Sequence, residues 1–427
     1  MEGGLEVREE EVVIVGAGIA GLATAVALKR VGVRCLVLER SERLRTTGAA
    51  LSLFPNAWLA LDALGVAHKL TPRYPPLLKM FLTDIGTGAV QEISHAAGGT
   101  GIRAGPRTVH RKVLLETLAE ELPANTIRFS SKLSSIQTQP GEGGSLLPIL
   151  HLQDGTVIKA KVLIGCDGVH SMVARWLGLS APVHSGRSAA RGLAHFPEPH
   201  GLEHAIYQFL DSEKRAGFVP LSDKDFYWFL TCKSTAEEDA KFSGNPELLQ
   251  REIIENFAKD FPSAYLDVVR HADVSELTWA PLVFRYPWNV ISGNVCQGTI
   301  TVAGDAMHPM TPDRGQGGCT ALEDAVVLGR HIGESFIRNN GQILPQETAE
   351  ALKRYFKERR WHTASVIATS YLSGWAQQSG STWWMKLIRD VIFYRFLFPI
   401  LFNMQYDCGR LPDVSTDELL KNQKKGD

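Results

Sequence analysis

Short apolar runs alternate with a helical pattern at the start of the chain. Residues 11–15 (EVVIV) are rich in β-branched side chains and predict a buried strand. A glycine-rich turn follows, then good helix formers over 22–31, a second apolar run at 34–38 (RCLVL) and an acid, Glu39. Strand, turn, helix and strand in this order predict a βαβ unit with parallel strands.

The pattern changes in the middle of the chain and then returns. Residues 161–165 and 298–303 predict two further buried strands, ending near Gly168 and Gly304. Between these glycines, short aromatic-rich strands surround one long helix expected near 245–260. This texture predicts a mostly antiparallel sheet that interrupts the α/β part.

Composition and charge exclude some partners. The chain has 427 residues, of which 44% are apolar and 21% charged, so two or three ordinary globular domains are expected. Lys and Arg number 45 against 46 Asp and Glu, which leaves a net charge of −1. Because no global basic field draws the protein to a polyanion, no nucleic-acid partner is expected.

Cysteine spacing and the N-terminus bear on the compartment. The six cysteines are scattered without a C-x-x-C pair, which argues against a disulfide framework or a zinc site and for reduced thiols. Residues 1–11 contain five glutamates, unlike a signal or transit peptide. We therefore expect an intracellular, cytoplasmic protein without a metal, as a monomer or homodimer.

One apolar stretch bears on membrane contact. Residues 391–402 (VIFYRFLFPILF) number about 12 against the ~20 needed for a span, and Arg395 and Pro399 interrupt them. No spanning segment is predicted, and a buried or substrate-lining segment is favoured. Peripheral contact with a membrane stays open, because Trp383 and Trp384 precede the stretch.

The turn after the first strand carries a phosphate-binding glycine pattern. In Gly16-x-Gly18-x-x-Gly21, the first glycine permits the tight turn, the second lets the backbone approach a pyrophosphate, and the third lets helix and strand pack closely. The helix N-terminus then faces the anion. Glu39, roughly 20 residues on, ends the second strand, where an acid can bond ribose hydroxyls. These features predict a dinucleotide site, and the chain has no second such fingerprint.

Two more polar turns follow predicted buried strands. Asp167 lies in GCDG and Asp305 in GDAMHP. Taken singly, such turns are common. Together with the glycine pattern they are three polar turns at strand carboxyl ends, the edge at which open α/β sheets bind ligands.

The three motifs together resemble the class A flavoprotein monooxygenases, the aromatic-hydroxylase family, over about residues 11–340. The resemblance implies that the glycine pattern holds the ADP half of FAD. It implies that the turn at Asp167 touches FAD and the passing NADPH or NADH, and that Asp305 binds the flavin ribitol.

A later loop is most similar to that of the bacterial FAD-dependent urate hydroxylases. TPDRGQGGC at 311–319 leads into a helix that contains ALEDA. In the light of this resemblance, the backbone N–H groups of the loop would face the flavin pyrimidine and stabilise its anionic reduced form. The implied cofactor contacts are Gly315, Gln316, Gly317, Gly318 and Cys319.

The interrupting domain supplies the substrate-side candidates. Residues 214–229 resemble the urate hydroxylase segment with its active-site Arg and Tyr, which here are Arg215 and Tyr227. An Arg can hold an anionic substrate and favour its ionised form, and a Tyr can orient a ring. Without the resemblance, Arg215 reads equally as an exposed loop cation and Tyr227 as a core aromatic. Residues 374–411 have no counterpart in the urate enzymes, so the substrate stays open.

The resemblance also implies a fold and further cofactor positions. We expect a Rossmann-type FAD-binding domain of the α/β class interrupted by a mostly antiparallel β-sheet substrate domain, followed by a helical C-terminal region. The expected bounds are 1–74 with 105–181 and 293–345 for FAD, 75–104 with 182–292 for substrate, 346–413 for the helical region and 414–427 for a disordered tail. The weaker matches to cofactor positions are Ala20, Arg40, Ser52, Arg111 and Leu133.

The implied activity is that of an FAD-dependent monooxygenase. NAD(P)H and O2 would serve to hydroxylate an aromatic or heteroaromatic small molecule through a flavin C4a-hydroperoxide. Two alternatives stay open: ring epoxidation of an apolar substrate, as in the similar carotenoid (zeaxanthin) epoxidases, and a non-catalytic FAD-binding protein. A flavin halogenase would need a Trp-x-Trp-x-Ile segment, which the chain lacks.

Overall fold

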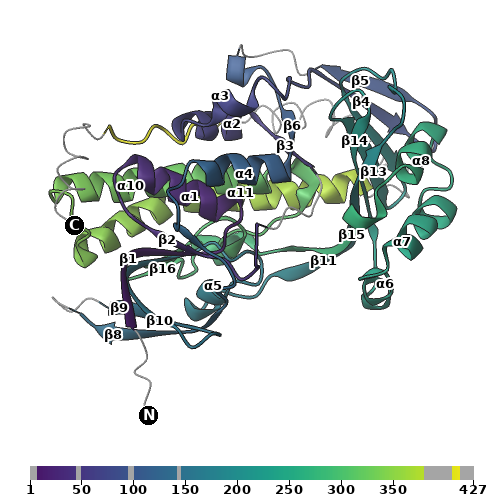
Figure 1. Ribbon diagram of the computed structural model, residues 1–427. Coiled ribbons are helices and arrows are strands. Elements are labelled where there is room, and N and C mark those ends of the chain that lie inside the picture. Colours follow the sequence, from purple (N-terminus) through teal and green to yellow (C-terminus); the bar gives the residue numbers. More distant parts are fainter. Residues whose placement is uncertain (1–6, 45–49, 95–100, 142–145, 379–405, 414–427) are drawn as a thin grey trace.

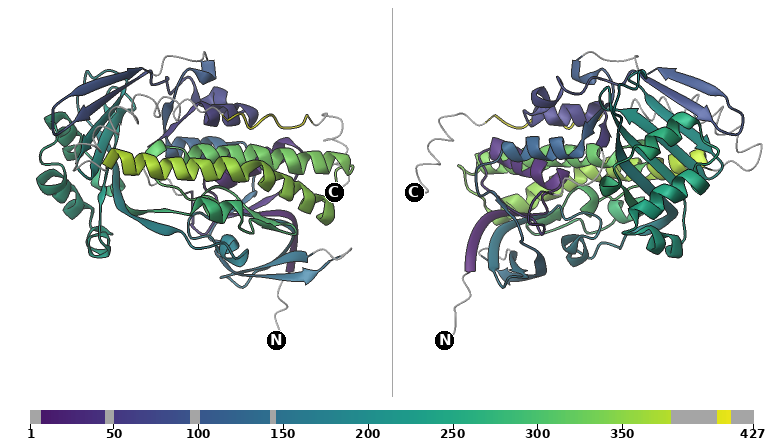
Figure 2. Two further views of the ribbon diagram at one scale, coloured as in Figure 1. Left: turned by 180° about the vertical axis from the view of Figure 1, so that it is seen from behind. Right: turned by 45° about the vertical axis from the view of Figure 1, so that its right-hand side comes forward.

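Two sheets and two long helices make up the architecture in the computed structural model (Figure 1). The structure describes residues 7–44, 50–94, 101–141, 146–378 and 406–413. Helices α10 (Gly317–Arg338) and α11 (Pro345–Gln378) run side by side along the long dimension of the molecule, and α10 packs against α1 and α2 (Figures 1 and 2).

The first sheet is mainly parallel. Its strand order is β16-β17-β10-β1-β2-β7, and β17, β10, β1, β2 and β7 all run in one direction. The antiparallel strands β8 and β9 continue it beside β10. The bounds are β1 Val7–Val15, β2 Leu36–Leu38, β7 Ile127–Arg128, β8 Leu133–Pro140, β9 Leu146–Leu152, β10 Val157–Gly165, β16 Cys296–Gln297 and β17 Ile300–Val302.

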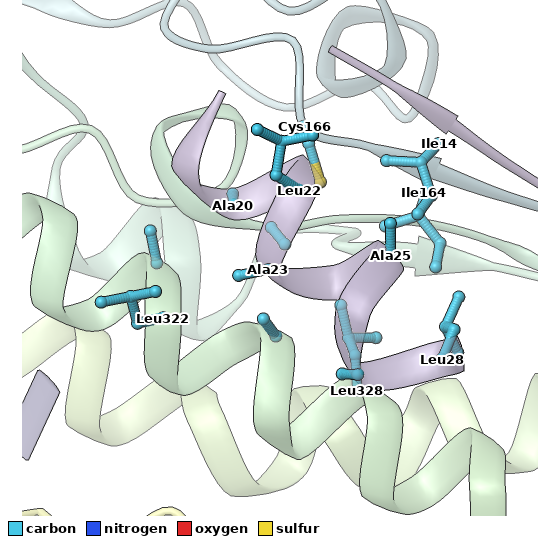
Figure 3. Close-up of a cluster of buried hydrophobic side chains, with 14 of the residues drawn as sticks. Ile14, Ala20, Leu22, Ala23, Ala25, Leu28, Ile164, Cys166, Leu322 and Leu328 are labelled. Atoms are coloured by element: carbon cyan, nitrogen blue, oxygen red, sulfur yellow. The ribbon is translucent and has the colours of Figure 1, made fainter. Parts of the chain in front are cut away.

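Helix α1 (Ile19–Arg30) fixes the distance between this sheet and α10 (Gly317–Arg338). Small residues line the helix contact: a Cβ on Gly329 would stand 2.6 Å from the Cβ of Ala27. Leu22 and Leu28 of α1 fill the space between strand residues such as Ile14 and α10 (Figure 3). Because both helix faces are apolar and buried, this core holds the turn between β1 and α1 in place.

The second sheet is mostly antiparallel. Its order is β15-β11-β14-β13-β12-β4-β5, with β12 and β4 as the parallel pair. The bounds are β4 Lys79–Asp84, β5 Val90–Ser94, β11 Val183–His195, β12 Ile206–Asp211, β13 Lys214–Pro220, β14 Asp225–Lys233 and β15 Thr278–Phe284. One face is apolar and packs through Trp228 and Phe218 against α8 and its neighbours, and the other faces the first sheet and α11.

Short helices and a two-stranded antiparallel sheet of β3 and β6 complete the fold. Helix α11 (Pro345–Gln378) contacts strands of both sheets and therefore ties them together. The remaining elements are β3 Ala50–Leu53, β6 Arg107–His110, α2 Pro55–Ala63, α3 Ala67–Leu70, α4 Arg111–Glu120, α5 Met172–Trp176, α6 Ala236–Phe242, α7 Pro246–Glu252, α8 Ser263–Arg270 and α9 Pro287–Ile291.

The sequence predicted this mixed α/β architecture correctly, with several local errors. The long helix expected near 245–260 is α7 followed by a π-helical turn at Ile253–Phe257. Strand β11 was not anticipated, because its sequence (HSGRSAARG) mixes small and charged residues instead of alternating apolar and polar ones. In the C-terminal region the structure describes helix α11 as far as Gln378 and then residues 406–413, which are not helical. The expected tail at 414–427 lies outside the described residues.

Two further observations concern the described residues alone. All six cysteines lie among them and are free. No described helix is both long and apolar enough to cross a membrane, and the stretch 391–402 lies outside the described part.

Candidate active site

The predicted polar turns meet at one edge of the first sheet. Because β1, β2, β10 and β17 are parallel, their carboxyl ends share this edge. Gly16 follows β1, Glu39 follows β2, Asp167 follows β10 and Asp305 follows β17. Residues nearly 300 positions apart in the sequence are thus neighbours around β1. The strand order reverses at β1, because β2 lies on one side of it and β10 on the other.

Each fingerprint glycine has its own steric reason. Gly16 has φ +103°, and a Cβ there would lie 2.4 Å from the carbonyl oxygen of Cys166. A Cβ on Gly21 would lie 1.9 Å from the carbonyl oxygen of Gly16, so the helix needs a glycine to approach the strand. A Cβ on Gly18 would meet no protein atom within 4 Å. That glycine leaves open space at the N-terminus of α1, as a pyrophosphate requires.

Glu39 braces the glycine turn. Its buried carboxylate accepts hydrogen bonds from the backbone N–H of Ala17 (2.9 Å) and of Ser41 (3.0 Å). Each carboxylate oxygen keeps further acceptor capacity, which is what a ribose diol uses. Arg40 beside it is exposed, and Ala20 is buried against the turn at Gly304.

The two aspartates differ in their surroundings. Asp167 accepts the N–H of Met172 (2.7 Å) through Oδ2, while its buried Oδ1 has no hydrogen-bond partner among the described residues. Asp305 lies in the 3-10 turn η5 (Gly304–Ala306), and its side chain is exposed to solvent although protein atoms crowd around it. That crowding raises the pKa of Asp305, against the opposing influence of nearby cations that include Arg111 and Arg191.

The loop at 311–319 delivers the N-terminus of α10 to the same edge. Gly315 has φ +64°, and a Cβ there would lie 3.0 Å from the ring of Phe54. Helix α10 begins at Gly317, so its first N–H groups and the positive end of its dipole lie here. Gln316 is buried and accepts a hydrogen bond from Asn56 (3.0 Å), whereas Gly318 packs over Leu51 and Cys319 is buried beneath the loop.

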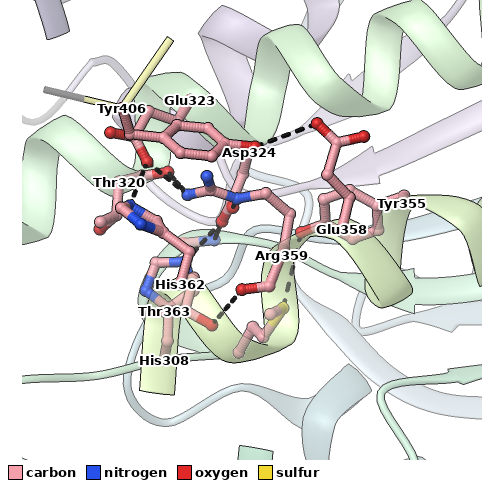
Figure 4. A network of polar contacts seen from close by, with 12 residues as sticks. His308, Thr320, Glu323, Asp324, Tyr355, Glu358, Arg359, His362, Thr363 and Tyr406 are labelled. Carbon is pink, nitrogen blue, oxygen red and sulfur yellow. Dashed lines mark hydrogen bonds and ion pairs between the residues drawn. The ribbon is translucent and has the colours of Figure 1, made fainter. Parts of the chain in front are cut away.

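A buried charge network locks these turns to the helices behind them (Figure 4). Arg359 of α11 bonds Asp324 (2.7 Å) and Glu323 (2.6 Å) of α10, and all three side chains are fully buried. Asp324 also accepts hydrogen bonds from His308 (2.5 Å) and from the N–H of Gly304 (2.9 Å). Burial opposes the charge of Asp324, but His308 and Arg359 outweigh it and lower its pKa to about 2. The network therefore fixes the turn that presents Asp305.

The weaker cofactor candidates lie around this edge. Ser52 on β3 shares a hydrogen bond with Thr108 on β6 (2.7 Å). Arg111 is half-buried at the start of α4, close enough to Asp305 to influence its pKa. Leu133 is buried at the start of β8.

Arg215 and Tyr227 share one face of the second sheet. In the register of β13 and β14, Arg215 pairs with Thr231 and Val219 with Tyr227. Phe229 lies between the pair: the Arg215 guanidinium carbon is 5.2 Å from its ring centre, and the Tyr227 ring is 6.2 Å from it. Tyr227 is half-exposed, but protein atoms crowd around its hydroxyl, and this partial desolvation raises its pKa. Arg215 is buried, so it is not an exposed loop cation.

Sequence reasoning missed the other arginines of this face. Arg187 and Arg191 lie on β11, the strand that was not anticipated, and Arg187 makes a bidentate ion pair with Asp313 (2.8 and 3.0 Å). Asp313 lies in the 3-10 turn η6 (Pro312–Arg314) of the glycine-rich loop. The sequence signal was the spacing of four residues between Arg187 and Arg191. That spacing places both side chains on one face only if the segment is a strand, and the strand was not predicted.

Comparison with known proteins shows the family of this chain. The profile of the family described as "FAD binding domain" matches residues 9–370. This chain belongs to the class A FAD-dependent monooxygenase family. Its members include Monooxygenase 2 of Arabidopsis thaliana, which is 40% identical over 410 residues and covers 94% of this chain and 98% of its own.

More distant monooxygenases share the fold. The FAD-dependent urate hydroxylase of Klebsiella pneumoniae is 26% identical over 352 residues, covering 81% of this chain and 85% of its own. The crystal structure of Klebsiella pneumoniae HpxO complexed with FAD and uric acid superposes with a TM-score of 0.77 at 24% identity, covering 92% of this chain and 96% of that one.

The residues of this monooxygenase fit FAD. Open space above Gly18, the bracing acid Glu39 and the unpartnered Oδ1 of Asp167 suit the polar groups of a dinucleotide. The N-terminus of α10 suits a group that becomes anionic on reduction. No described group of three or more His, Cys, Asp or Glu side chains is arranged to hold a metal ion.

Proposed function

We propose that this monooxygenase uses NADPH or NADH and O2 to hydroxylate a small aromatic or heteroaromatic molecule. The observation that carries the proposal is the sheet face of Arg215, Phe229 and Tyr227, which is aromatic and cationic. Arg187 and Arg215 of the same face contact Asp313 in the loop that leads to the N-terminus of α10, so this face lies against the cofactor edge.

The cofactor assignments are part of this proposal. FAD supplies the reduction and O2 chemistry when it is bound. The chain's own residues would hold it: the turn of Gly16, Gly18 and Gly21 at the pyrophosphate, Glu39 at a ribose and Asp305 at the ribitol. The division into FAD-binding segments (1–74, 105–181 and 293–345) and substrate-facing segments (75–104 and 182–292) belongs to the same proposal.

On the substrate side, Tyr227 and Arg215 would act by binding and orientation. The Tyr227 ring offers a flat apolar surface, and no hydrogen bond of its hydroxyl is found among the described residues. That hydroxyl is therefore free to donate to a substrate oxygen or nitrogen. Arg215 adds positive potential beside it, which favours an ionised, electron-rich ring.

The test is a substrate screen with isotopic oxygen. Purified holoenzyme is mixed with NADH or NADPH and a panel of aromatic acids, quinolones and purines, urate among them, under 18O2. Stimulated nicotinamide oxidation together with a product 18 mass units heavier than the substrate is the expected result, because one labelled oxygen is added. A product in which the label bridges two ring carbons would favour epoxidation. Nicotinamide oxidation that no compound stimulates would refute the proposal.

A variant separates orientation from packing. Tyr227→Phe keeps the ring, so FAD content and nicotinamide oxidation should stay close to wild type. If the hydroxyl orients the substrate, more of the consumed NAD(P)H should appear as hydrogen peroxide and less as product. Equal coupling in both proteins would leave Tyr227 only a packing role. Phe229→Leu, a change at the adjacent ring, reports whether loss of aromatic packing alone has the same effect.

A further inference from the structure

Three arginines of the second sheet point to the same side. On β11, Arg187 and Arg191 are four residues apart and therefore share a face, because side chains alternate along a strand. The pairing of Arg191 with Phe229 on β14 puts both on the face of Arg215 and Tyr227. The opposite face carries Ala190, Ala194 and Trp228 in an apolar core.

Two of these arginines contact Asp313 within the protein. Arg187 is buried and holds both oxygens of Asp313. Arg215 is buried as well; it lies 3.5 Å from Asp313 Oδ1 and donates to the Asp313 carbonyl oxygen (3.3 Å). Gly374 of α11 closes this group, because a Cβ there would lie 2.3 Å from Asp313 Oδ2. Arg187 and Arg215 therefore bind Asp313 and hold the loop that leads to α10, which leaves little of their charge for a ligand.

Arg191 differs in its contacts. It is half-buried, and its guanidinium makes no hydrogen bond and no ion pair within the described part of the chain, although its backbone carbonyl accepts a hydrogen bond from Thr278. It nevertheless lies close to Tyr227, because it pairs with Phe229 on β14 and Tyr227 is two residues away on the same face. Its charge opposes the rise in pKa that burial causes at Tyr227 and at Asp305. A partly desolvated guanidinium without a counterion is costly, and a planar anion is the partner that its fork of N–H groups matches.

We propose that Arg191 binds the anionic group of the substrate, a carboxylate or ring oxyanion, and so selects acidic aromatic molecules. The proposal rests on the proposed function for the identity of the site. It assigns the direct anion contact to Arg191, while Arg215 and Arg187 hold Asp313. A neutral isostere of the substrate should gain nothing from Arg191, because it offers no charge to compensate.

The test measures binding to oxidised holoenzyme without NAD(P)H, so that it does not depend on turnover. The probes are 2-hydroxybenzoate and 1-hydroxy-2-naphthoate, each paired with its carboxamide, and the signal is the change in flavin absorbance. Wild type should bind at least one anion about tenfold or more tightly than its amide. Arg191→Gln should weaken anion binding roughly 10- to 100-fold and leave amide binding unchanged, and Arg191→Lys should restore part of the loss.

Controls separate this role from others. Arg251→Gln changes an exposed arginine of α7 and should leave every affinity unchanged. FAD content must stay at the wild-type level in Arg191→Gln; a loss of FAD would indicate that Arg191 serves the cofactor and would overturn the proposal. It is also overturned if no anion binds, if wild type does not prefer anions over amides, or if Arg191→Gln keeps that preference. Failure of the isotope screen with anion selectivity intact would refute the reaction and not the site.

Discussion

The sharpest test of the fingerprint compares alanine at Gly18 with alanine at Gly21. Gly18 has φ −80° and ψ −171°, which any residue adopts, and its added Cβ meets no protein atom within 4 Å. Gly18→Ala should therefore change the stability of the apoprotein by no more than about 0.5 kcal/mol. The methyl group would, however, stand where the pyrophosphate must approach the backbone, so FAD binding should be lost.

Gly21→Ala should act on the fold first and on FAD binding only as a consequence. Its Cβ would lie 1.9 Å from the Gly16 carbonyl oxygen, and real contacts of this kind stay above about 3 Å. Helix α1 or the glycine turn must therefore move by about 1 Å in a tightly packed core. Overpacking of this kind costs about 3 kcal/mol or more. The apoprotein itself should be destabilised, with FAD binding damaged as a consequence.

Thermal unfolding of apoprotein with and without added FAD separates the two effects. At FAD concentrations 100 times Kd, wild type gains about 2.7 kcal/mol, which for a chain of 427 residues corresponds to a Tm rise of roughly 3 °C. Gly18→Ala should show the wild-type apo Tm and no rise with FAD. Gly21→Ala should melt several degrees lower before any FAD is added. A Gly18→Ala protein that keeps the full FAD-dependent rise would refute the assignment of the pyrophosphate to this turn.

Three further variants probe the cofactor edge and the network behind it. Asp305→Asn removes a charged acceptor and should weaken FAD binding about 10- to 100-fold, measured as FAD retained after dilution and gel filtration; full retention would remove Asp305 from the site. Arg359→Met leaves Glu323 and Asp324 buried without their cation and should cost about 3–5 kcal/mol in urea unfolding; an unchanged midpoint would contradict the network. Because the pKa of Asp324 falls from its ordinary value of 3.8 to about 2 in the fold, its contribution of about 2 kcal/mol is complete above pH 5 and is lost as the pH falls toward 2. Asp324→Asn should flatten the stability profile over that interval, with the wild-type slope as its reference.

The sequence predicted the cofactor edge better than the substrate side, for a physical reason. Gly16, Gly21 and Glu39 are determined by local geometry: a turn, a close approach and a strand end within one βαβ unit. Such features need residues of fixed type at fixed spacing, so they are visible in a linear pattern. Asp167 and Asp305 were predictable as well, because each comes after an apolar strand of the same parallel sheet.

The partners that cross the molecule could not be predicted in this way. Arg359 and Asp324 are 35 residues apart, and Arg187 and Asp313 are 126 apart, without a fixed spacing to reveal them. His308 stands in the GDAMHP motif, but no fixed spacing in the sequence identifies Asp324 as its partner. Arg191 was missed together with β11, since a strand of small and charged residues has no apolar alternation. Tertiary packing, and not local preference, decides these positions.

The wide separation of paired strands has a consequence for how this protein is made. Strand β1 pairs with β10, so Val7 lies opposite Val157. Strand β10 also pairs with β17, which lies near residue 300. The ion pairs of Glu323 and Asp324 with Arg359 cannot form until Arg359 has been synthesised. On the ribosome, the N-terminal strand and its helix therefore emerge long before their partners exist. We expect the first sheet to fold only after translation is nearly complete. Its apolar strands stay unpaired until then, so we also expect the nascent chain to depend on chaperones.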